Sequence, residues 1–283
     1  MLVLPEGLSC WDGEHSWLMT QNQCVPRTIT RMNSILFDSK LLDTELTTDE
    51  IHVWCASLDQ PVSRLQRLTR LISTDETMRA ERFHFEEDGR RFIVRRAILR
   101  TILSGYLSVE PSRFQFCYGK NGKPQVADTF GEGKISFNLS HSEGLALYAF
   151  AREREIGVDI EHVRDIPEME QIAESYFSAR ENAIFRTLPE NERKEAFFNC
   201  WTRKEAFIKA TGDGLSWPLD RFDVSLVPGE PARLLRIEGD SKAASQWFIQ
   251  DLKPAFGFAA AFAVKGGCGR VHCWQWSDWA ADN

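Results

Sequence analysis

Two long segments of helical pattern, each set among short strand-like runs, constrain the fold of this 283-residue chain more than any other feature. Residues 86–107 carry apolar side chains near helical spacing, and residues 189–214 form a longer pattern that Gly212 closes. Short runs rich in β-branched and aromatic residues precede, separate and follow them. The pattern predicts an α+β fold of two similar lobes, each a small, mainly antiparallel sheet packed on one long helix.

The shorter elements follow a simple order along the chain. Capping-box patterns at Ser73 with Glu76 and at Ser178 with Glu181 predict two helix starts, and Asp88 is the expected N-cap of the long helix within residues 86–107. Strands are predicted at 51–58, 113–118, 134–140, 145–151, 155–161, 222–227, 232–238, 246–252, 256–264 and 271–276. We therefore expect a poorly ordered N-terminal extension (1–48), an N-terminal lobe (49–156) and a C-terminal lobe (157–283).

Composition narrows the function classes. With 43% hydrophobic residues the chain can bury a large core, and its formal net charge of −7 argues against binding nucleic acid through a basic surface. No segment approaches the roughly 20 apolar residues that span a bilayer, and no signal-peptide pattern opens the sequence. The seven cysteines are scattered without a CxxC pair and are interpreted as reduced thiols. We expect a cytoplasmic protein with neither a membrane nor a nucleic-acid partner.

The stretch GVDIEHVRD, residues 157–165, places two acids one residue apart on a predicted strand. Side chains at positions i and i+2 of a strand share a face, so Asp159 and Glu161 project together while Ile160 points away. Two like charges side by side repel each other. A positive group is therefore expected between them, and a metal ion is the first candidate.

The long C-terminal helical segment contributes a second charged pair, Glu205 and Lys209, one helical turn apart. Trp201 precedes Glu205 by one turn on the same stripe. Taken alone, the pair is also typical of ordinary helix stabilisation, worth about 0.2–0.5 kcal/mol. Whether Glu205 and Lys209 are functional depends on which side chains face them in the fold.

Three further stretches offer groups that bind anions. Ser140 and His141 in FNLSHS end an apolar strand, where hydroxyl, imidazole and amide groups can cradle a phosphate or form a plain turn. Adjacent Ser and His point to opposite sides of an extended backbone, which argues against a catalytic triad. Lys123 lies in the Gly-rich turn GKNGKP, which lacks P-loop spacing and is also typical of solvated lysines. Seven arginines between Arg79 and Arg100 form either a local anion site or a solvated helix face.

In this order, GKP, FNLSHS, GVDIE and WTRKEAFIKATGDGLSWPL resemble the 4'-phosphopantetheinyl transferases of the surfactin-synthetase-activating type. The resemblance covers about residues 73–263. It implies an enzyme that transfers phosphopantetheine from coenzyme A to a serine of an apo acyl or peptidyl carrier protein, releasing 3',5'-ADP. It also implies a monomer in fatty-acid or secondary-metabolite biosynthesis, whose two lobes form a pseudo-dimer with the coenzyme site between them.

The resemblance assigns a metal site and three catalytic residues, Glu205, Lys209 and His141. Asp159, Glu161 and Glu205 are the implied Mg²⁺ ligands, and oxygen-only ligation suits that hard ion. Glu205 is also the implied base for the carrier serine, directly or through a water on the metal. Lys209 is implied to stabilise or protonate the departing phosphate.

The resemblance also assigns the coenzyme A contacts. His141 and Lys123 are implied to hold phosphates, and Ser140 to contact the nucleotide end. Arg79 and Arg91 fall where the family places basic residues near the 3'-phosphate and the adenine. Where some relatives carry a further basic residue this chain has Glu76, so recognition of the 3'-phosphate is expected to rely on other arginines or to be weaker.

Two other functions fit parts of the pattern. A Mg²⁺-dependent nucleotide pyrophosphate hydrolase would share the acids and basic groups, with water attacking in place of the carrier serine. An inactive relative that only binds carrier proteins is the other alternative. Such a relative is expected to lose at least one of the implied functional residues, all of which are present here.

Overall fold

The computed structural model describes residues 38–39 (backbone only), 45–119, 121–127, 135–212, 214, 217–240 and 242–276. The extension predicted at residues 1–48 lies largely outside these residues. Among the described helices, none has both the length and the apolar content needed to cross a bilayer.

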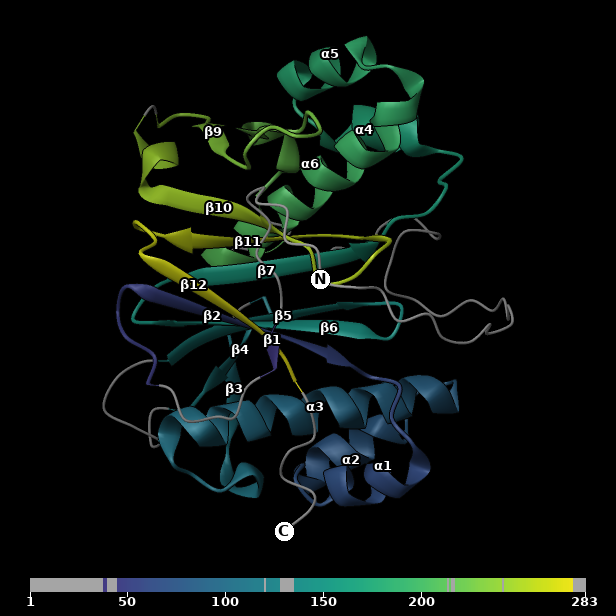
Figure 1. Cartoon of the computed structure of the whole chain (residues 1–283), viewed down its shortest axis with the longest axis vertical. Helices are drawn as coiled ribbons and strands as arrows, with labels where there is room; N and C mark the ends of the chain where they lie inside the picture. The colour runs from purple at the N-terminus through teal and green to yellow at the C-terminus, as the bar shows by residue number, and fades with distance from the viewer. Residues whose placement is uncertain are drawn as a thin grey trace.

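The elements stack in four layers, helix on sheet on sheet on helix, along the long axis of the molecule (Figure 1). The first helical layer contains α1 (Val62–Thr69), α2 (Thr74–Ala80) and α3 (Glu86–Leu107). The last contains α4 (Met169–Tyr176), α5 (Ala179–Thr187) and α6 (Glu190–Thr211). The two long helices, α3 and α6, thus lie outside a pair of facing sheets, and the predicted α+β fold class is confirmed.

The first sheet has the strand order β1-β12-β2-β6-β5 and the second has the order β10-β11-β7. Their strands are β1 (Asp38–Ser39), β2 (Glu50–Ser57), β5 (Ile135–Ser142), β6 (Leu145–Arg152), β7 (Ile156–His162), β10 (Trp247–Leu252), β11 (Phe258–Lys265) and β12 (Arg270–Gln275). Two small hairpins, β3 (Phe116–Tyr118) with β4 (Pro124–Val126) and β8 (Phe222–Val224) with β9 (Leu234–Ile237), complete the described strands. Pairing is antiparallel except where β12 joins β1 and β2.

The apolar core has three parts that match the layers. One cluster lies between α3 and the first sheet, and another surrounds α6. The third fills the space between the two sheets with side chains such as Val53 and Leu147 from one sheet and Val158 and Phe262 from the other. Because each central strand is covered on both faces, the sheets hold the polar side chains of their edges in fixed positions.

Local signals placed most helix ends correctly. Both capping boxes are present, at Ser73 and at Ser178, and Gly212 ends α6 with a φ of +75°. Asp88 is not an N-cap, because α3 begins two residues earlier and Phe85 is its N-cap residue. Helix α1 was not predicted.

Strand β12 departs from the predicted division of the chain. Residues 157–283 were predicted to form the C-terminal lobe, yet β12 pairs in parallel with β2 in the sheet of the first lobe. Parallel pairing of distant segments leaves no local sequence signal, because the connection is a long crossover and not a turn. For the rest of the chain, the boundary between the two lobes near residue 156 remains a prediction.

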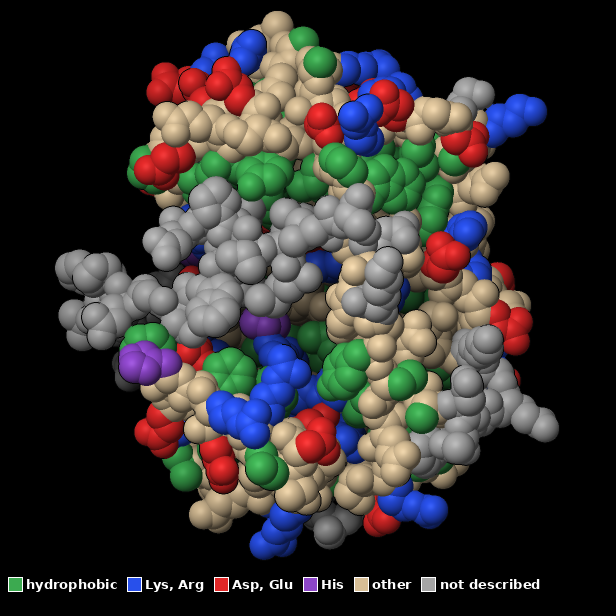
Figure 2. Space-filling view, turned by 180° about the vertical axis from the view of Figure 1, so that it is seen from behind, with side chains coloured by type: hydrophobic (Ala, Val, Ile, Leu, Met, Phe, Trp, Pro, Cys, Tyr) green, Lys and Arg blue, Asp and Glu red, His purple; other side chains and the backbone are tan. Residues whose placement is uncertain are grey.

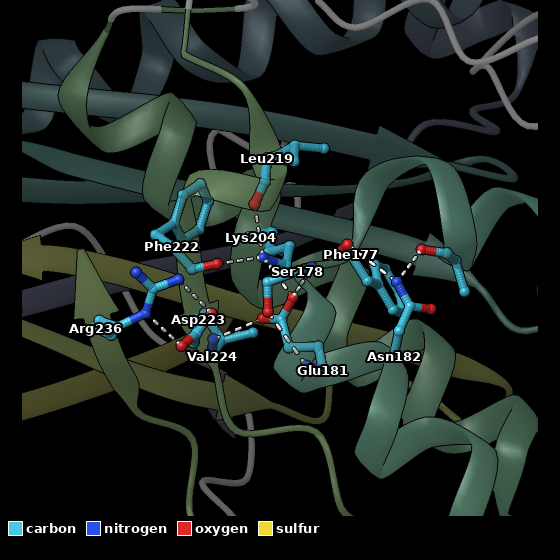
Figure 3. A network of polar contacts seen from close by, with 11 residues as sticks. Phe177, Ser178, Glu181, Asn182, Lys204, Leu219, Phe222, Asp223, Val224 and Arg236 are labelled. Atoms are coloured by element: carbon cyan, nitrogen blue, oxygen red, sulfur yellow. Dashed lines mark hydrogen bonds and ion pairs between the residues drawn. The ribbon is translucent and has the colours of Figure 1, made fainter. Parts of the chain in front are cut away.

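A buried ion pair fixes α6 against α5 (Figure 3). Lys204 Nζ lies 2.7 Å from Glu181 Oε2 and also donates to the carbonyls of Leu219 and Phe222. The other oxygen of Glu181 accepts from the amide of Val224. Both charged side chains are almost fully buried, and each has its hydrogen-bonding groups satisfied, as a buried pair requires. Lys204 therefore holds in place the helix that carries its neighbour Glu205.

Candidate active site

Strand β7 and helix α6 approach each other closely at Gly157. A Cβ atom at this position would lie 2.1 Å from the carbonyl oxygen of Ala206 and 2.3 Å from the amide nitrogen of Ala210. Only glycine permits such a backbone approach. Because alternate residues of a strand share a face, Asp159 and Glu161 project on the side of α6, which carries the second predicted pair.

Asp159 is the centre of the polar contacts at this junction. Its side chain is buried, and Oδ1 accepts hydrogen bonds from Ser140 Oγ at 2.9 Å and Lys209 Nζ at 2.5 Å. The Lys209 ammonium also donates to Ser140 Oγ at 3.0 Å. A positive group therefore does face the acid pair, and in this structure it is the ammonium of Lys209, standing where a bound cation would contact Asp159.

Two buried carboxylate oxygens at this junction, Asp159 Oδ2 and Glu205 Oε1, have no hydrogen-bond partner among the described residues. A buried polar atom left in this way costs about 1–3 kcal/mol, so such atoms need an explanation. A hard divalent cation, which takes oxygen ligands, would satisfy both. Within the described residues the ligand atoms of the three acids do not all lie within 4.8 Å of one another, so binding a cation requires them to close around it.

The three acids share an electrostatic conflict. Burial raises the pKa of Glu161 to about 8, and the nearby Asp159 carboxylate adds to the rise. Burial likewise raises the pKa of Glu205 to about 7, against the opposing effect of Lys209. Burial also raises the pKa of Asp159, although Lys209 and Ser140 favour its charged form. Such raised values mark a site where added positive charge is stabilising.

Strand β5 supports the acids from the neighbouring sheet edge. Asn138, Ser140 and Ser142 alternate along β5 and all reach β7: Asn138 Oδ1 accepts from the amide of Val158 at 2.9 Å, and Ser142 Oγ accepts from the amide of His162 at 3.1 Å. Ser142 Oγ also lies 3.4 Å from Glu161 Oε2. Side chains thus join the two sheet edges. Ser140, predicted to contact the nucleotide, here orients Asp159.

His141 points away from these contacts, since it is the odd member of the alternation. Burial lowers the pKa of His141 well below its usual value, and the positive charges of Arg95, Lys209 and Arg91 lower it further. The imidazole is therefore neutral at pH 7 and can donate one hydrogen bond to an anion. The same charges show that two α3 arginines and the α6 lysine lie near this residue.

The arginines predicted for the 3'-phosphate and adenine lie on the first lobe. Arg91 pairs with Asp59 and Glu87, both at 2.7 Å. Arg79 is exposed, with its guanidinium 5.3 Å from the centroid of the Phe92 ring. Lys and Arg side chains gather near the middle of the face opposite to that of Figure 1, over the lobe that contains α3 (Figure 2).

Lys123 does not occupy the predicted position. Its ammonium donates to three backbone carbonyls, those of Ile156 at 2.8 Å, Lys209 at 2.7 Å and Ala210 at 3.1 Å. An ammonium has three donors, so all of them are used. In this structure Lys123 therefore binds backbone carbonyls of β7 and of the C-terminal end of α6, where a positive charge is favourable, and its contact with a phosphate stays a prediction.

Glu76, noted as a departure from the family pattern, is a structural residue. Its side chain is buried and forms ion pairs with Arg96 at 2.5 Å and Arg100 at 2.7 Å. Both guanidinium groups also lie over the ring of Phe116. Two of the seven clustered arginines therefore form buried ion pairs in the first lobe.

Comparison with known proteins identifies the family of the chain. The model of the 4'-phosphopantetheinyl transferase superfamily matches residues 155–263, and a model described as the N-terminal part of a 4'-phosphopantetheinyl transferase matches residues 57–152. The transferase HetI of Nostoc is 44% identical over 78% of this chain and 90% of its own length. The chain belongs to this transferase superfamily.

More distant members of the superfamily share the same region. The transferase Sfp of Bacillus subtilis is 32% identical over 60% of this chain and 74% of its own length. The human L-aminoadipate-semialdehyde dehydrogenase-phosphopantetheinyl transferase is 26% identical over 65% of this chain and 64% of its own length. The superfamily match contains the three acids and Lys209, whereas His141 and the arginines lie in the N-terminal match.

Sequence reasoning missed three residues of the candidate site. Gly157 shares the alternation of the acids and could have been found from that spacing, because a glycine on a buried strand face often marks a close approach. Arg95 was counted in the arginine cluster but not linked to His141. Asn138 carries no signal of its own, since its role depends on a strand that pairs in another sheet.

Proposed function

We propose that this phosphopantetheinyl transferase acts at the β7–α6 junction, with Asp159, Glu161 and Glu205 as ligands of Mg²⁺. The chain transfers the 4'-phosphopantetheine group of coenzyme A to a serine hydroxyl of an apo carrier protein and releases 3',5'-ADP. The bond between the serine oxygen and phosphorus forms, and the bond between phosphorus and the ADP oxygen breaks. The roles of the individual side chains in this reaction are proposals.

The pair of buried carboxylate oxygens without hydrogen-bond partners, on Asp159 and Glu205, carries the metal assignment. Glu161 adds a third carboxylate with a pKa raised to about 8. When bound, Mg²⁺ supplies a hard positive charge that offsets the charge of the pyrophosphate. With a cation neutralising Asp159, the ammonium of Lys209, which contacts that acid in this structure, would be available to the substrate.

Glu205 is the proposed base. Burial raises its pKa in the absence of a metal, and additional positive charge nearby favours the deprotonated form that accepts a proton. Its carboxylate takes the proton of the carrier serine as the new bond forms. Its position is fixed by the neighbouring Lys204, which is bound into the core.

Lys209 and His141 are proposed to serve the phosphates. Lys209 is partly exposed and sits one turn after Glu205, so its ammonium can turn from Asp159 to the departing phosphate and stabilise or protonate it. The neutral His141 donates a hydrogen bond to a phosphate oxygen. Ser140 keeps Asp159 oriented. Arg91 and Arg79 are proposed to bind the 3'-phosphate and the adenine of coenzyme A, with Arg95 as an additional positive charge.

The partners and state of the enzyme are proposed as follows. Acyl and peptidyl carrier proteins, usually acidic around their serine, are proposed to dock on the patch of Lys and Arg side chains that Figure 2 shows over the lobe containing α3. The enzyme is proposed to be a monomer, because one chain provides both lobes. It is also proposed to work in the cytoplasm. The lobe boundary near residue 156 is proposed as the division between them, with β12 returning to the first.

The test is the intact mass of an apo acyl carrier protein after incubation with the enzyme, coenzyme A and Mg²⁺, beside a sample with EDTA. A gain of one phosphopantetheine group, lost with EDTA, is expected. A peptidyl carrier is the second acceptor. Loss of coenzyme A without any carrier would indicate the hydrolase, and no mass gain on either carrier with folded enzyme would indicate an inactive binding protein.

A further inference from the structure

A second cluster of metal-ligating side chains lies on the parallel strands β2 and β12, outside the transferase site. Glu50 and His52 are alternate residues of β2 and share a face, and His272 of β12 is directly opposite His52 in the register. One ligand atom from each of the three residues lies within 4.8 Å of those from the other two. The return of β12 to the first sheet is what creates this group.

The distances suit a small divalent ion. His272 Nε2 lies 3.5 Å from Glu50 Oε1, and His52 Nε2 lies 3.9 Å from Glu50 Oε2. Ligands about 2.1 Å from a tetrahedral Zn²⁺ are about 3.4 Å from one another, so small side-chain movements complete the geometry. The exposed Arg270, 3.6 Å from Glu50 Oε1, has room to withdraw when a cation binds.

The surroundings orient the imidazoles. His52 is fully buried, and its Nδ1 is 2.8 Å from the hydroxyl of Tyr106, which also accepts a hydrogen bond from Trp54 Nε1 at 3.0 Å. Metal-binding histidines commonly have such a partner on the second ring nitrogen, because it fixes the ring and its tautomer. The ring of Trp274 stacks on His272 and meets His52 edge-on. Nε2 of both histidines is left on the side of Glu50.

We propose that Glu50, His52 and His272 bind Zn²⁺. Imidazole nitrogen with one carboxylate is a ligand set for Zn²⁺ and not for the oxygen-preferring Mg²⁺ of the transferase site. Three protein ligands leave a fourth position for water. The ion stabilises the folded chain by joining β12 to β2, since it binds the folded state and the unfolded chain has no such cluster.

The test is a Zn²⁺ titration by calorimetry on the full chain, without a histidine tag, after treatment with a chelator and in excess Mg²⁺. Excess Mg²⁺ occupies the carboxylate site. The variants are His272→Ala and Glu50→Gln, with His84→Ala as the control, because His84 is exposed and outside the cluster. Asp159→Asn tests independence from the transferase site. Unfolding temperatures with and without Zn²⁺ are recorded for each variant.

One Zn²⁺ per chain and a rise in unfolding temperature of about 5 °C are expected for the wild type, His84→Ala and Asp159→Asn. Loss of an outer-shell partner alone weakens metal binding about 10–100-fold, so loss of a ligand should weaken it at least that much. If His272→Ala does not fold, Glu50→Gln decides. The proposal is overturned if the wild type binds no Zn²⁺ in Mg²⁺, or if Glu50→Gln binds it as tightly as the wild type.

Discussion

The buried ion pair between Lys204 and Glu181 gives the sharpest stability prediction. Lys204→Met keeps much of the side-chain volume but removes the ammonium, leaving the Glu181 carboxylate buried without its positive partner. The carbonyls of Leu219 and Phe222 also lose a donor each. Breaking a buried pair from one side costs about 3–5 kcal/mol, so the free energy of unfolding should fall by that amount.

The assay is urea unfolding followed by circular dichroism, with two matched variants. Lys194 lies on the same helix as Lys204 and forms an exposed pair with Asp165. Lys194→Met should therefore change the free energy of unfolding by no more than about 1 kcal/mol. Adding Glu181→Gln to Lys204→Met should recover part of the loss, because the buried charge is removed as well. A loss for Lys204→Met as small as that of the Lys194 control would refute the reasoning.

The remaining predictions concern the transferase site. Asp159→Ala or Glu205→Ala should abolish transfer with an unchanged circular dichroism spectrum, and near-normal turnover at saturating Mg²⁺ would contradict the metal assignment. Gly157→Ala should destabilise the chain by about 1–3 kcal/mol and lower activity, because its Cβ meets backbone atoms of α6, whereas Gly267→Ala, with open space around it, should do neither. The pKa values of Glu161 and Glu205 lie above their ordinary value, so the folded state holds extra protons and Mg²⁺-free stability should fall as pH rises from about 4.5 to 8. Saturating Mg²⁺ should reduce this dependence of stability on pH. An unfolding temperature that does not change with pH in EDTA would show that charging these buried acids is not unfavourable. Carrier affinity should weaken as salt is added, and a flat salt titration would exclude docking on the patch of Lys and Arg side chains over the α3 lobe.

Local chemistry made much of this fold predictable. The Ser178 capping box and the Gly212 terminus depend on residues close in sequence, and the start of α5 and the end of α6 were placed correctly. Asp159 and Glu161 share a face because of strand geometry alone. These features need no knowledge of the rest of the chain.

Long-range partners account for what was missed. Lys123 is a turn lysine in the sequence, and only the packed fold brings it to the carbonyls at the end of α6. The pairing of β12 with β2 joins segments more than 200 residues apart, and it creates the cluster of Glu50, His52 and His272. No spacing rule relates such residues, because their proximity follows from the order of strands in the sheet.

The most direct measurement on the transferase site is the binding of Mn²⁺, a spectroscopic substitute for Mg²⁺, by electron paramagnetic resonance in the presence of coenzyme A. The wild type, saturated with Zn²⁺, should bind one Mn²⁺ that Mg²⁺ displaces, and Asp159→Asn should bind it far more weakly. Equal Mn²⁺ binding by the wild type and Asp159→Asn would contradict the assignment of Asp159, Glu161 and Glu205 as the catalytic metal site.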